Sequence, residues 1–239
     1  MRAERYAGRG PASRRLPLIE SRADMAFVTL EGMEGCGKST QARRLRARLG
    51  PDAVVTKEPG GTTIGAAIRQ IVLDQGSHGL VPEAESLLYF ADRAQHVAEV
   101  IRPVLAAGRL VVCDRYVESS LAYQGYGRGL SLDAIRQVAD LATGGLRPDL
   151  IVLIELPIEE GLLRVGRRGG HDRMESEVRD FYERVWAGYQ ALLAREPSRW
   201  ARVSGEGSED AVAERLWAVL ETRGLLAGLA DAGGTRGAR

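Results

Sequence analysis

The chain has 239 residues, 44% of them hydrophobic and 27% charged, which is the composition of an ordinary globular protein. Its 33 lysine and arginine residues nearly balance its 32 acidic residues, and the net charge of +1 excludes a general attraction to nucleic acid or to an anionic membrane. The 2 cysteines, far apart, exclude a disulfide framework, and no apolar run reaches the ~20 residues of a membrane span. We therefore expect a cytoplasmic protein without nucleic-acid or membrane partners.

Residues 1–24 contain six arginines and show no hydrophobic periodicity. They lack the apolar centre of a secretory signal, which spans about 7–15 residues, and their acidic side chains disfavour an Arg-rich transit peptide. We expect a disordered extension, or a chain whose translation normally starts at Met25. The folded domain is expected over 25–222, and residues 223–239, rich in Gly, Ala and Arg, are expected to fray.

Beyond residue 25, short β-like runs alternate with longer helical runs, which is typical of a parallel sheet covered by helices. Gly50 and Gly108 stand where helix ends favour a left-handed residue. The pattern predicts an α/β fold, a doubly wound sheet of five mainly parallel strands with helices on both faces. The expected strands are 27–31, 53–56, 109–114, 150–155 and 201–204, and the expected helices are 39–49, 63–74, 82–106, 132–143, 158–167, 176–195 and 209–222.

Directly after the first strand, the chain reads GMEGCGKST and fits the phosphate-binding pattern G-x-x-x-x-G-K-[ST]. The glycines let several N–H groups converge on phosphate oxygens, and the following helix adds the positive end of its dipole. Lys38 is predicted to reach the β- and γ-phosphates of ATP, and the Ser39 hydroxyl to bind Mg²⁺. The sequence therefore predicts a P-loop NTPase-type fold. Its expected ATP-binding residues are Gly32, Met33, Glu34, Gly35, Cys36, Gly37, Lys38, Ser39 and Thr40.

The third expected strand ends in Asp114 and Arg115, at the carboxyl edge where such sheets bind ligands. Asp114 is predicted as a second Mg²⁺ ligand with Arg115 as a cation beside it, and the alternative is a surface ion pair. Asparagine is absent, which excludes the guanine-reading N-K-x-D element of GTPases. Lys38 and Lys57 are the lysines of a chain that otherwise uses arginine, which indicates that the Lys38 site needs an ammonium group.

A kinase also needs an acceptor site and cations that close over the transferred group. Arg93 lies beside Tyr89 and Phe90 in the expected helix 82–106 and is a candidate for the acceptor site. The stretch 164–173, rich in Arg and Gly, follows the fourth strand and its helix. It is predicted to form a lid, and the alternative is a solvated basic loop.

Six motifs then occur in a fixed order: EGMEGCGKST (31–40), KEPGGT (57–62), LLYFADRAQH (87–96), DRYVESSLAYQGYGRG (114–129), RPDLIVLIEL (147–156) and RRGGHDRMESE (167–177). In these motifs the chain resembles bacterial thymidylate kinase (dTMP kinase), a P-loop nucleoside monophosphate kinase, from about residue 27 to about residue 220. The resemblance implies transfer of phosphate from ATP to dTMP with Mg²⁺, giving dTDP and ADP for dTTP biosynthesis. It also implies a homodimer.

The resemblance assigns roles to individual acceptor-side residues. Arg93 is implied to hold the dTMP phosphate, Arg115 to lie beside the transferring group, and Glu34 to lie near the 3′-hydroxyl. Tyr89 is implied to stack on thymine, and Tyr123 to crowd a ribose 2′-hydroxyl. The base pocket is implied to be lined by Ser119, Ser120 and Gln124.

Some family members carry an arginine in the P-loop, where this chain has Gly35, and others carry the catalytic arginine in the lid. Arg168 and Arg173 are therefore the implied lid cations, joining Lys38 and Arg115 as catalytic residues.

Two other functions remain open from the residues: a related kinase with another acceptor, such as dUMP or a deoxynucleoside, and a non-catalytic ATP-dependent switch. The acceptor-side residues count against the switch, which needs none of them. Cys36 is either a small side chain within the loop or an oxidisable thiol. The histidines show no ligand spacing, so no histidine metal site is expected.

Overall fold

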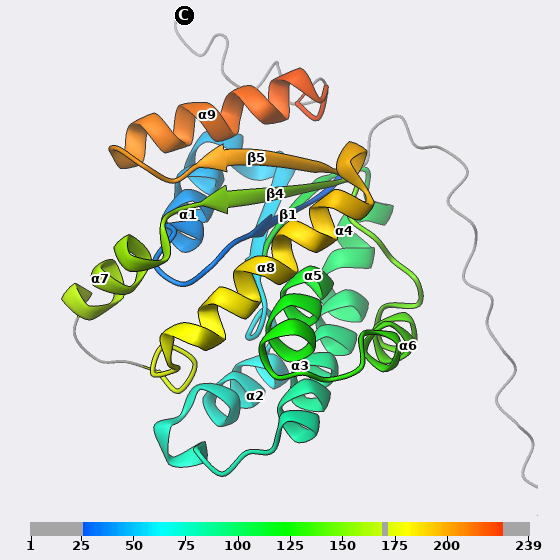
Figure 1. Cartoon of the computed structure of the whole chain (residues 1–239). Coiled ribbons are helices and arrows are strands. Elements are labelled where there is room, and N and C mark those ends of the chain that lie inside the picture. Colours follow the sequence, from blue (N-terminus) through cyan, green and yellow to red (C-terminus); the bar gives the residue numbers. More distant parts are fainter. Residues whose placement is uncertain (1–25, 169–171, 227–239) are drawn as a thin grey trace, which may run out of the picture.

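The structure is a computed structural model that describes residues 26–168 and 172–226. Its centre is a parallel sheet in the order β2-β3-β1-β4-β5, with β1 in the middle (Figure 1). Every neighbouring pair of these strands is parallel, which confirms the predicted doubly wound α/β fold. The strands are β1 (Phe27–Glu31), β2 (Ala53–Lys57), β3 (Leu110–Asp114), β4 (Leu150–Glu155) and β5 (Trp200–Ser204).

Helices cover both faces of the sheet, with α1 and α9 on one face and α3, α4 and α8 on the other (Figure 1). The helices are α1 (Lys38–Leu49), α2 (Thr63–Leu73), α3 (Pro82–His96), α4 (Arg102–Ala106), α5 (Val117–Ser120), α6 (Leu132–Thr143), α7 (Ile158–Arg168), α8 (Arg179–Arg195) and α9 (Glu209–Thr222). The π-helical segment Val97–Ile101 joins α3 to α4, and a second one, Leu121–Gly127, continues α5. Short 3-10 turns lie at Gly50–Asp52, Gln75–Ser77 and Pro197–Arg199.

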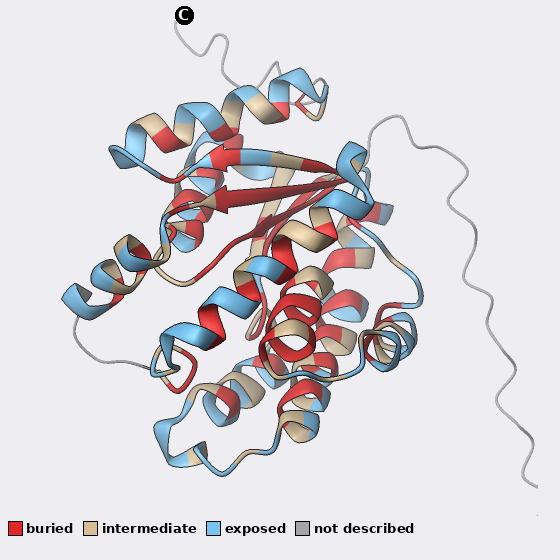
Figure 2. Ribbon diagram, viewed as in Figure 1, coloured by how far each residue is buried: buried red, intermediate tan, exposed pale blue. Residues whose placement is uncertain are grey.

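The central strands β1, β3 and β4 are buried on both faces, because successive side chains point in opposite directions and helices cover both sides of the sheet, whereas the edge strands β2 and β5 are partly exposed. Val112 of β3 packs with Leu45 of α1 and Leu216 of α9, whereas the preceding Val111 packs with Ile101 on the other face. Figure 2 shows the resulting pattern, with buried central strands between the two layers of helices and a partly exposed β5 at the edge of the sheet. This packing fixes the carboxyl edge of the sheet, where the P-loop follows β1.

Most element bounds agree with the prediction within one residue, and helix 82–106 is continuous through its π-helical segment. The start of α8 was predicted wrongly, at Ser176 rather than Arg179. The reason is a separate turn in which Asp172 N donates to Glu175 Oε2 at 3.3 Å and Glu175 N donates to Asp172 Oδ1 at 2.9 Å. Gly50 and Gly108 have positive φ angles, as predicted.

The sequence did not predict the helical stretch from α5 through Gly127, because its glycines disfavour a helix. Packing favours glycine at both positions, more strongly at Gly127. A Cβ on Gly125 would lie 2.4 Å from Leu132 Cδ2, and a Cβ on Gly127 would lie 2.6 Å from Phe181 Cε2 of α8. The stretch therefore lies directly against α6 and α8, and this close packing positions the acceptor-side residues it carries.

The predicted extension over 1–24 lies outside the described residues, as does the part of the predicted tail beyond residue 226. Residues 223–226 form a turn, closed by Leu225 N donating to Leu220 O, and Leu226 packs on the α1–α9 core. Within 26–168 and 172–226, no helix combines the length and the hydropathy needed to cross a membrane.

Candidate nucleotide site

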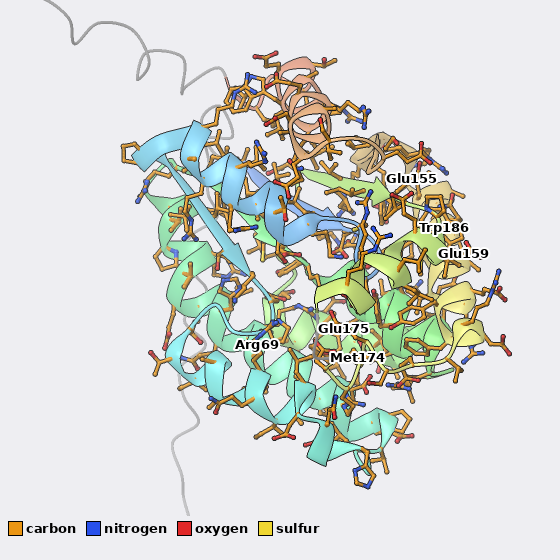
Figure 3. All side chains as sticks on the ribbon, turned by 90° about the vertical axis from the view of Figure 1, so that its left-hand side faces the viewer. Arg69, Glu155, Glu159, Met174, Glu175 and Trp186 are labelled. Carbon is orange, nitrogen blue, oxygen red and sulfur yellow. The ribbon has the colours of Figure 1, made fainter. Side chains whose placement is uncertain are left out.

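A cavity of about 990 Å³ opens at the carboxyl edge of the sheet, where the P-loop, the ends of β2 and β3, and helices α2 and α3 meet. Arg69 of α2 lies in its wall together with Met174 and Glu175 of the turn before α8 (Figure 3). The cavity brings together most of the predicted site. The predicted residues in its wall are Glu34, Gly35, Cys36, Gly37, Lys38, Ser39, Thr40, Tyr89, Arg93, Asp114, Arg115, Ser119, Ser120, Tyr123 and Gln124.

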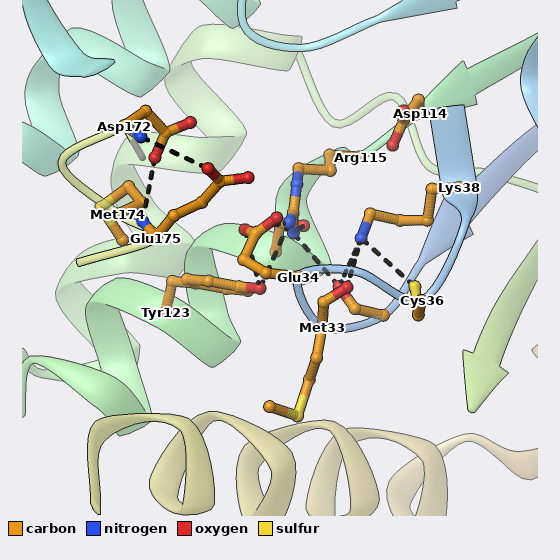
Figure 4. Close-up of polar contacts among 12 residues, drawn as sticks. Met33, Glu34, Cys36, Lys38, Asp114, Arg115, Tyr123, Asp172, Met174 and Glu175 are labelled. Carbon is orange, nitrogen blue, oxygen red and sulfur yellow. Dashed lines mark hydrogen bonds and ion pairs between the residues drawn. The ribbon is translucent and has the colours of Figure 1, made fainter. Parts of the chain in front are cut away.

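The P-loop folds around the ammonium group of Lys38. Lys38 Nζ donates to Gly32 O at 2.9 Å, to Met33 O at 2.7 Å and to Cys36 Sγ at 3.4 Å (Figure 4). Gly32 and Met33 do not line the cavity, and Met33 instead packs in the core. They therefore contribute to the site through the carbonyl groups that hold Lys38.

The Cys36 thiol lies beneath the loop, where it packs with Ile154 and Leu156. A Cβ on Gly32 would lie 2.8 Å from the Cys36 sulfur. Glycine at position 32 therefore lets the start of the loop pack closely against the Cys36 side chain. The cysteine is buried, which limits the access of oxidants to it.

Ser39 and Asp114 face each other across the start of α1. Ser39 Oγ donates to Asp114 Oδ2 at 2.8 Å, while Asp114 Oδ1 is buried and has no hydrogen-bond partner among the residues that the structure describes. A hydroxyl oxygen and a carboxylate with one uncommitted oxygen are hard ligands of the kind Mg²⁺ prefers. The predicted pair therefore fits a magnesium site.

Arg115 joins the P-loop to the acceptor side of the cavity. Its Nη1 donates to Gly32 O at 3.3 Å and to Ser119 Oγ at 3.1 Å, and its Nη2 lies 2.5 Å from Glu34 Oε1 and 3.2 Å from the Tyr123 hydroxyl (Figure 4). These contacts orient the Arg115 guanidinium before any ligand binds.

The backbone at Arg115 is strained. Its φ angle is 74°, and within the described residues it is the one non-glycine position with positive φ. This conformation costs roughly 1–2 kcal/mol for a residue with a side chain. Arg115 N donates to Leu30 O at 3.0 Å, and the next amide, Tyr116 N, donates to Glu31 Oε1 at 2.8 Å. Contacts with β1 therefore maintain the strained turn that aims Arg115.

Glu31, a fully buried carboxylate at the end of β1, is a residue that the sequence analysis missed. It accepts hydrogen bonds from Ser119 Oγ at 2.6 Å and from the Tyr189 hydroxyl at 2.9 Å. Burial raises the pKa of Glu31, and the hydrogen bond from Ser119 and the charge of Arg115 oppose that rise. An acidic residue within an otherwise apolar, buried strand was the available signal.

Arg93 is 1% exposed, and its charge is balanced within the protein. Its Nε donates to Glu58 Oε2 at 2.7 Å, Nη1 to Ser120 Oγ at 3.0 Å, and Nη2 to Tyr116 O at 2.7 Å. The sequence analysis quoted Glu58 within the KEPGGT motif but assigned it no role. Its contact with Arg93 joins β2 to α3 on the acceptor side of the cavity.

Glu58, His96 and Cys113 place possible metal-ligand atoms within 4.8 Å of one another, a grouping that the sequence did not predict. His96 Nδ1 lies 2.9 Å from Glu58 Oε1, and His96 Nε2 lies 2.8 Å from Thr56 Oγ1. Both ring nitrogens and both Glu58 oxygens are therefore engaged in hydrogen bonds or ion pairs. The group acts as a buried polar network that holds Arg93 in place.

The predicted lid residues differ in their positions. The side chain of Arg168, at the end of α7, lies outside the described residues. Arg173 does not line the cavity: its Nη2 pairs with Glu85 Oε2 at 2.6 Å and its Nε donates to Val72 O at 2.9 Å. Arg164 of α7, the first residue of the predicted lid stretch, does line the cavity, although the sequence analysis did not name it as a catalytic cation.

Helix α7 leaves no room for a side chain at the tip of the P-loop. A Cβ on Gly35 would lie 2.1 Å from Gly161 O, and a Cβ on Gly161 would lie 2.6 Å from Glu34 O. An arginine at position 35 would therefore displace α7. The close contact with α7 thus disfavours a catalytic arginine in the P-loop and favours one in the lid.

Comparison with known proteins identifies the family. The thymidylate kinase family model matches residues 30–216. A thymidylate kinase of Synechococcus sp. (strain JA-2-3B'a(2-13)) is 53% identical over 202 residues, which cover 82% of this chain and 95% of the relative. One from Deinococcus radiodurans is 48% identical over 83% of this chain and 97% of the relative. The chain belongs to the thymidylate kinase family.

A solved structure of thymidylate kinase from Ehrlichia chaffeensis has the same fold, with a TM-score of 0.68 at 29% identity over 82% of this chain and 98% of that one. The thymidylate kinase match begins in β1 and ends in α9, so it spans the whole sheet and the cavity. The resemblance inferred from the motifs is confirmed, and with it the assignment of the chain as a phosphotransferase.

Proposed function

We propose that this protein transfers the γ-phosphoryl group of ATP to dTMP, giving dTDP and ADP. The observation that most supports this proposal is the position of Arg115. Its guanidinium contacts Gly32 of the P-loop and also Ser119 and Tyr123 on the acceptor side of the same cavity. A cation at the junction of two phosphate-binding regions is what phosphoryl transfer requires, because catalysis there depends on positioning and on charge stabilisation.

On the donor side, the amides of the P-loop and Lys38 bind the ATP phosphates. Ser39 and Asp114 would hold Mg²⁺, which would neutralise part of the negative charge of the phosphates. The loop carbonyls hold the Lys38 ammonium in the wall of the cavity, where its charge favours the binding of phosphate.

On the acceptor side, Tyr89 stacks on thymine, while Ser119, Ser120 and Gln124 surround the base. Tyr123 excludes a 2′-hydroxyl, and its own hydroxyl lies 3.2 Å from Glu34 Oε1, which is proposed to lie near the 3′-hydroxyl. Arg93 contributes donors toward the dTMP phosphate side. Arg93 pairs with Glu58 and Arg115 pairs with Glu34, so a carboxylate partly balances the charge of each arginine.

The lid supplies the last cation, and Arg168 is the stronger candidate because Arg173 is engaged with Glu85. Arg168→Ala is expected to lower kcat by about 100-fold with little change in the KM for ATP, since the contact forms in the transition state. The neighbouring, exposed Arg167→Ala is the matched control. Steady-state kinetics check this prediction, and near-normal turnover of both Arg168→Ala and Arg173→Ala would remove the lid from the mechanism.

We also propose that the protein lies in the reducing cytoplasm, where both cysteines stay free. There it is proposed to form a homodimer through α2 and α3. The two helices pack together and expose large apolar side chains: Ile64 is 53%, Ile71 48% and Leu87 58% exposed. The double variant Ile64→Glu, Ile71→Glu is expected to halve the mass measured by light scattering, because buried charges oppose association. Val178→Glu, at another exposed apolar position, should leave the mass unchanged; a monomeric wild type would contradict the proposal.

The reaction is tested with a panel of acceptors and Mg-ATP: dTMP, dUMP, dCMP, GMP and thymidine. We expect the highest kcat/KM with dTMP, and ADP and dTDP in equal amounts. Preference for GMP or thymidine would overturn the proposal and favour a different kinase of this fold. ATP binding without turnover of any acceptor would favour the switch.

A further inference from the structure

Glu85 of α3 is a buried carboxylate with no role in the proposed chemistry. It lies one helical turn before Tyr89 and contacts three side chains from other parts of the fold. Gln124 Nε2 donates to its Oε1 at 2.8 Å, Arg128 Nη2 donates to its Oε2 at 3.1 Å, and Arg173 Nη2 lies 2.6 Å from Oε2. A fully buried acid is costly to maintain, so the contacts that it makes need an explanation.

The contact with Gln124 determines the orientation of that amide. An ionised carboxylate only accepts hydrogen bonds, whereas a glutamine amide has an accepting end and a donating end of nearly equal size. Turning the amide by 180° would place Gln124 Oε1 against Glu85 Oε1, with lone pairs facing each other. The NH₂ group therefore stays on the Glu85 side, whichever ligand occupies the cavity.

Glu85 is held in the ionised form that this argument requires. Burial by itself would raise the pKa of Glu85, but the hydrogen bonds from Arg128 and Gln124 and the charges of both arginines outweigh it, so the pKa lies below its usual value. Arg128 also pairs with Glu177 at 2.5 Å, which fixes it from a second side. The carboxylate is thus ionised and immobile.

Since Gln124 lines the cavity, the fixed amide presents its carbonyl oxygen as an acceptor on the side away from Glu85. Thymine and uracil carry a hydrogen on ring nitrogen N3 and donate there, whereas cytosine has a lone pair at N3. A carbonyl oxygen pairs with the first two bases and faces the lone pair of the third. A freely turning amide would accept either kind of base.

We propose that Glu85 is a specificity-determining positioning residue: it fixes the amide of Gln124 so that the acceptor pocket selects bases with a hydrogen on N3. The inference rests on the proposed function, because it requires the base of the acceptor to lie beside Gln124. Glu85 itself touches no reacting atom.

The test compares kcat/KM for dTMP, dUMP and dCMP in the wild type, in Glu85→Gln and in Glu177→Gln. In Glu85→Gln a neutral amide can pair with Gln124 in either orientation, so we expect the preference for dTMP over dCMP to fall by ~10-fold or more. The preference for dTMP over dUMP should not change, because both bases donate from N3. The KM for ATP should also remain the same.

Glu177→Gln controls for the loss of an ion pair, since it removes the Glu177 partner of Arg128 but keeps every contact of Glu85, the bond to Gln124 included. Its dTMP-to-dCMP preference should equal that of the wild type even where its Tm falls. If Glu85→Gln yields no folded protein, Glu85→Asp is the second variant. It keeps the negative charge but moves the carboxylate away from Gln124 by one methylene, so it should also lower the dTMP-to-dCMP preference.

Two results overturn the inference: an unchanged dTMP-to-dCMP preference in a folded Glu85 variant, or an equal loss in Glu177→Gln, which would show a general loosening of the pocket. These results differ from failure of the proposed function, in which the wild type itself would show no preference for dTMP.

Discussion

Replacing Lys38 with methionine is expected to lower kcat by about 1,000-fold, because the variant loses a preorganised cation at the site of the transferring charge. The loss has two sources. The ammonium no longer stabilises negative charge on the β- and γ-phosphates, and the carbonyl groups of Gly32 and Met33 lose the donor that shapes the loop. Steady-state kinetics with ATP and dTMP measure the effect, and thermal unfolding checks that the fold survives.

Lys38→Arg separates charge from shape. The chain uses arginine at nearly every basic position, so an arginine here would be expected if any cation sufficed. The Lys38 side chain is 6% exposed, and a planar guanidinium has no equivalent place between the Gly32 and Met33 carbonyls. We expect Lys38→Arg to lose nearly as much activity as Lys38→Met. Activity close to that of the wild type would contradict the requirement for an ammonium group.

The P-loop could be predicted from the sequence because its function depends on local backbone geometry. Three glycines, a lysine and a serine within nine residues determine the positive φ angles of Gly32, Gly35 and Gly37 and the position of the helix that follows. Asp114 and Arg115 were predictable for a related reason: a buried parallel strand leads to the carboxyl edge, and the next residues lie there.

The partners of the acidic residues that hold the site were not predictable, because they come from distant parts of the chain. Glu31 accepts from Tyr189, 158 residues away, and Glu58 accepts from Arg93, 35 residues away. No period or motif encodes such pairs; they arise when the sheet and its helices pack. The same applies to Arg173, whose motif indicated a lid but whose side chain pairs with Glu85 in the structure.

Some of the missed features had local signals that pointed the wrong way. Gly125 and Gly127 disfavour a helix, yet they lie in one that packs closely against α6 and α8, and α8 leaves little room for a Cβ at Gly127. Arg115 adopts a φ angle typical of glycine, and tertiary contacts with β1 maintain it. In both cases tertiary packing outweighs local propensity.

Replacing Arg115 with lysine is expected to lower kcat by about 100-fold and to raise the KM for dTMP more than the KM for ATP. Lysine keeps the charge, but a single ammonium cannot contact Gly32 O and Ser119 Oγ while also reaching Glu34 and Tyr123. The donor loop and the acceptor pocket would then no longer be joined by one rigid group. Full kinetics at varied ATP and dTMP measure the split between the two substrates.

The strained backbone gives an independent check on the same residue. Arg115→Ala keeps a Cβ at φ 74°, whereas Arg115→Gly relieves the strain, and both remove the guanidinium. We expect the glycine variant to be more stable than the alanine variant by about 1 kcal/mol, with equally low activity in both. Equal stabilities would show that the turn relaxes in the absence of the side chain. Unequal activities would mean that backbone strain, as well as the guanidinium, determines how the acceptor phosphate is positioned for transfer.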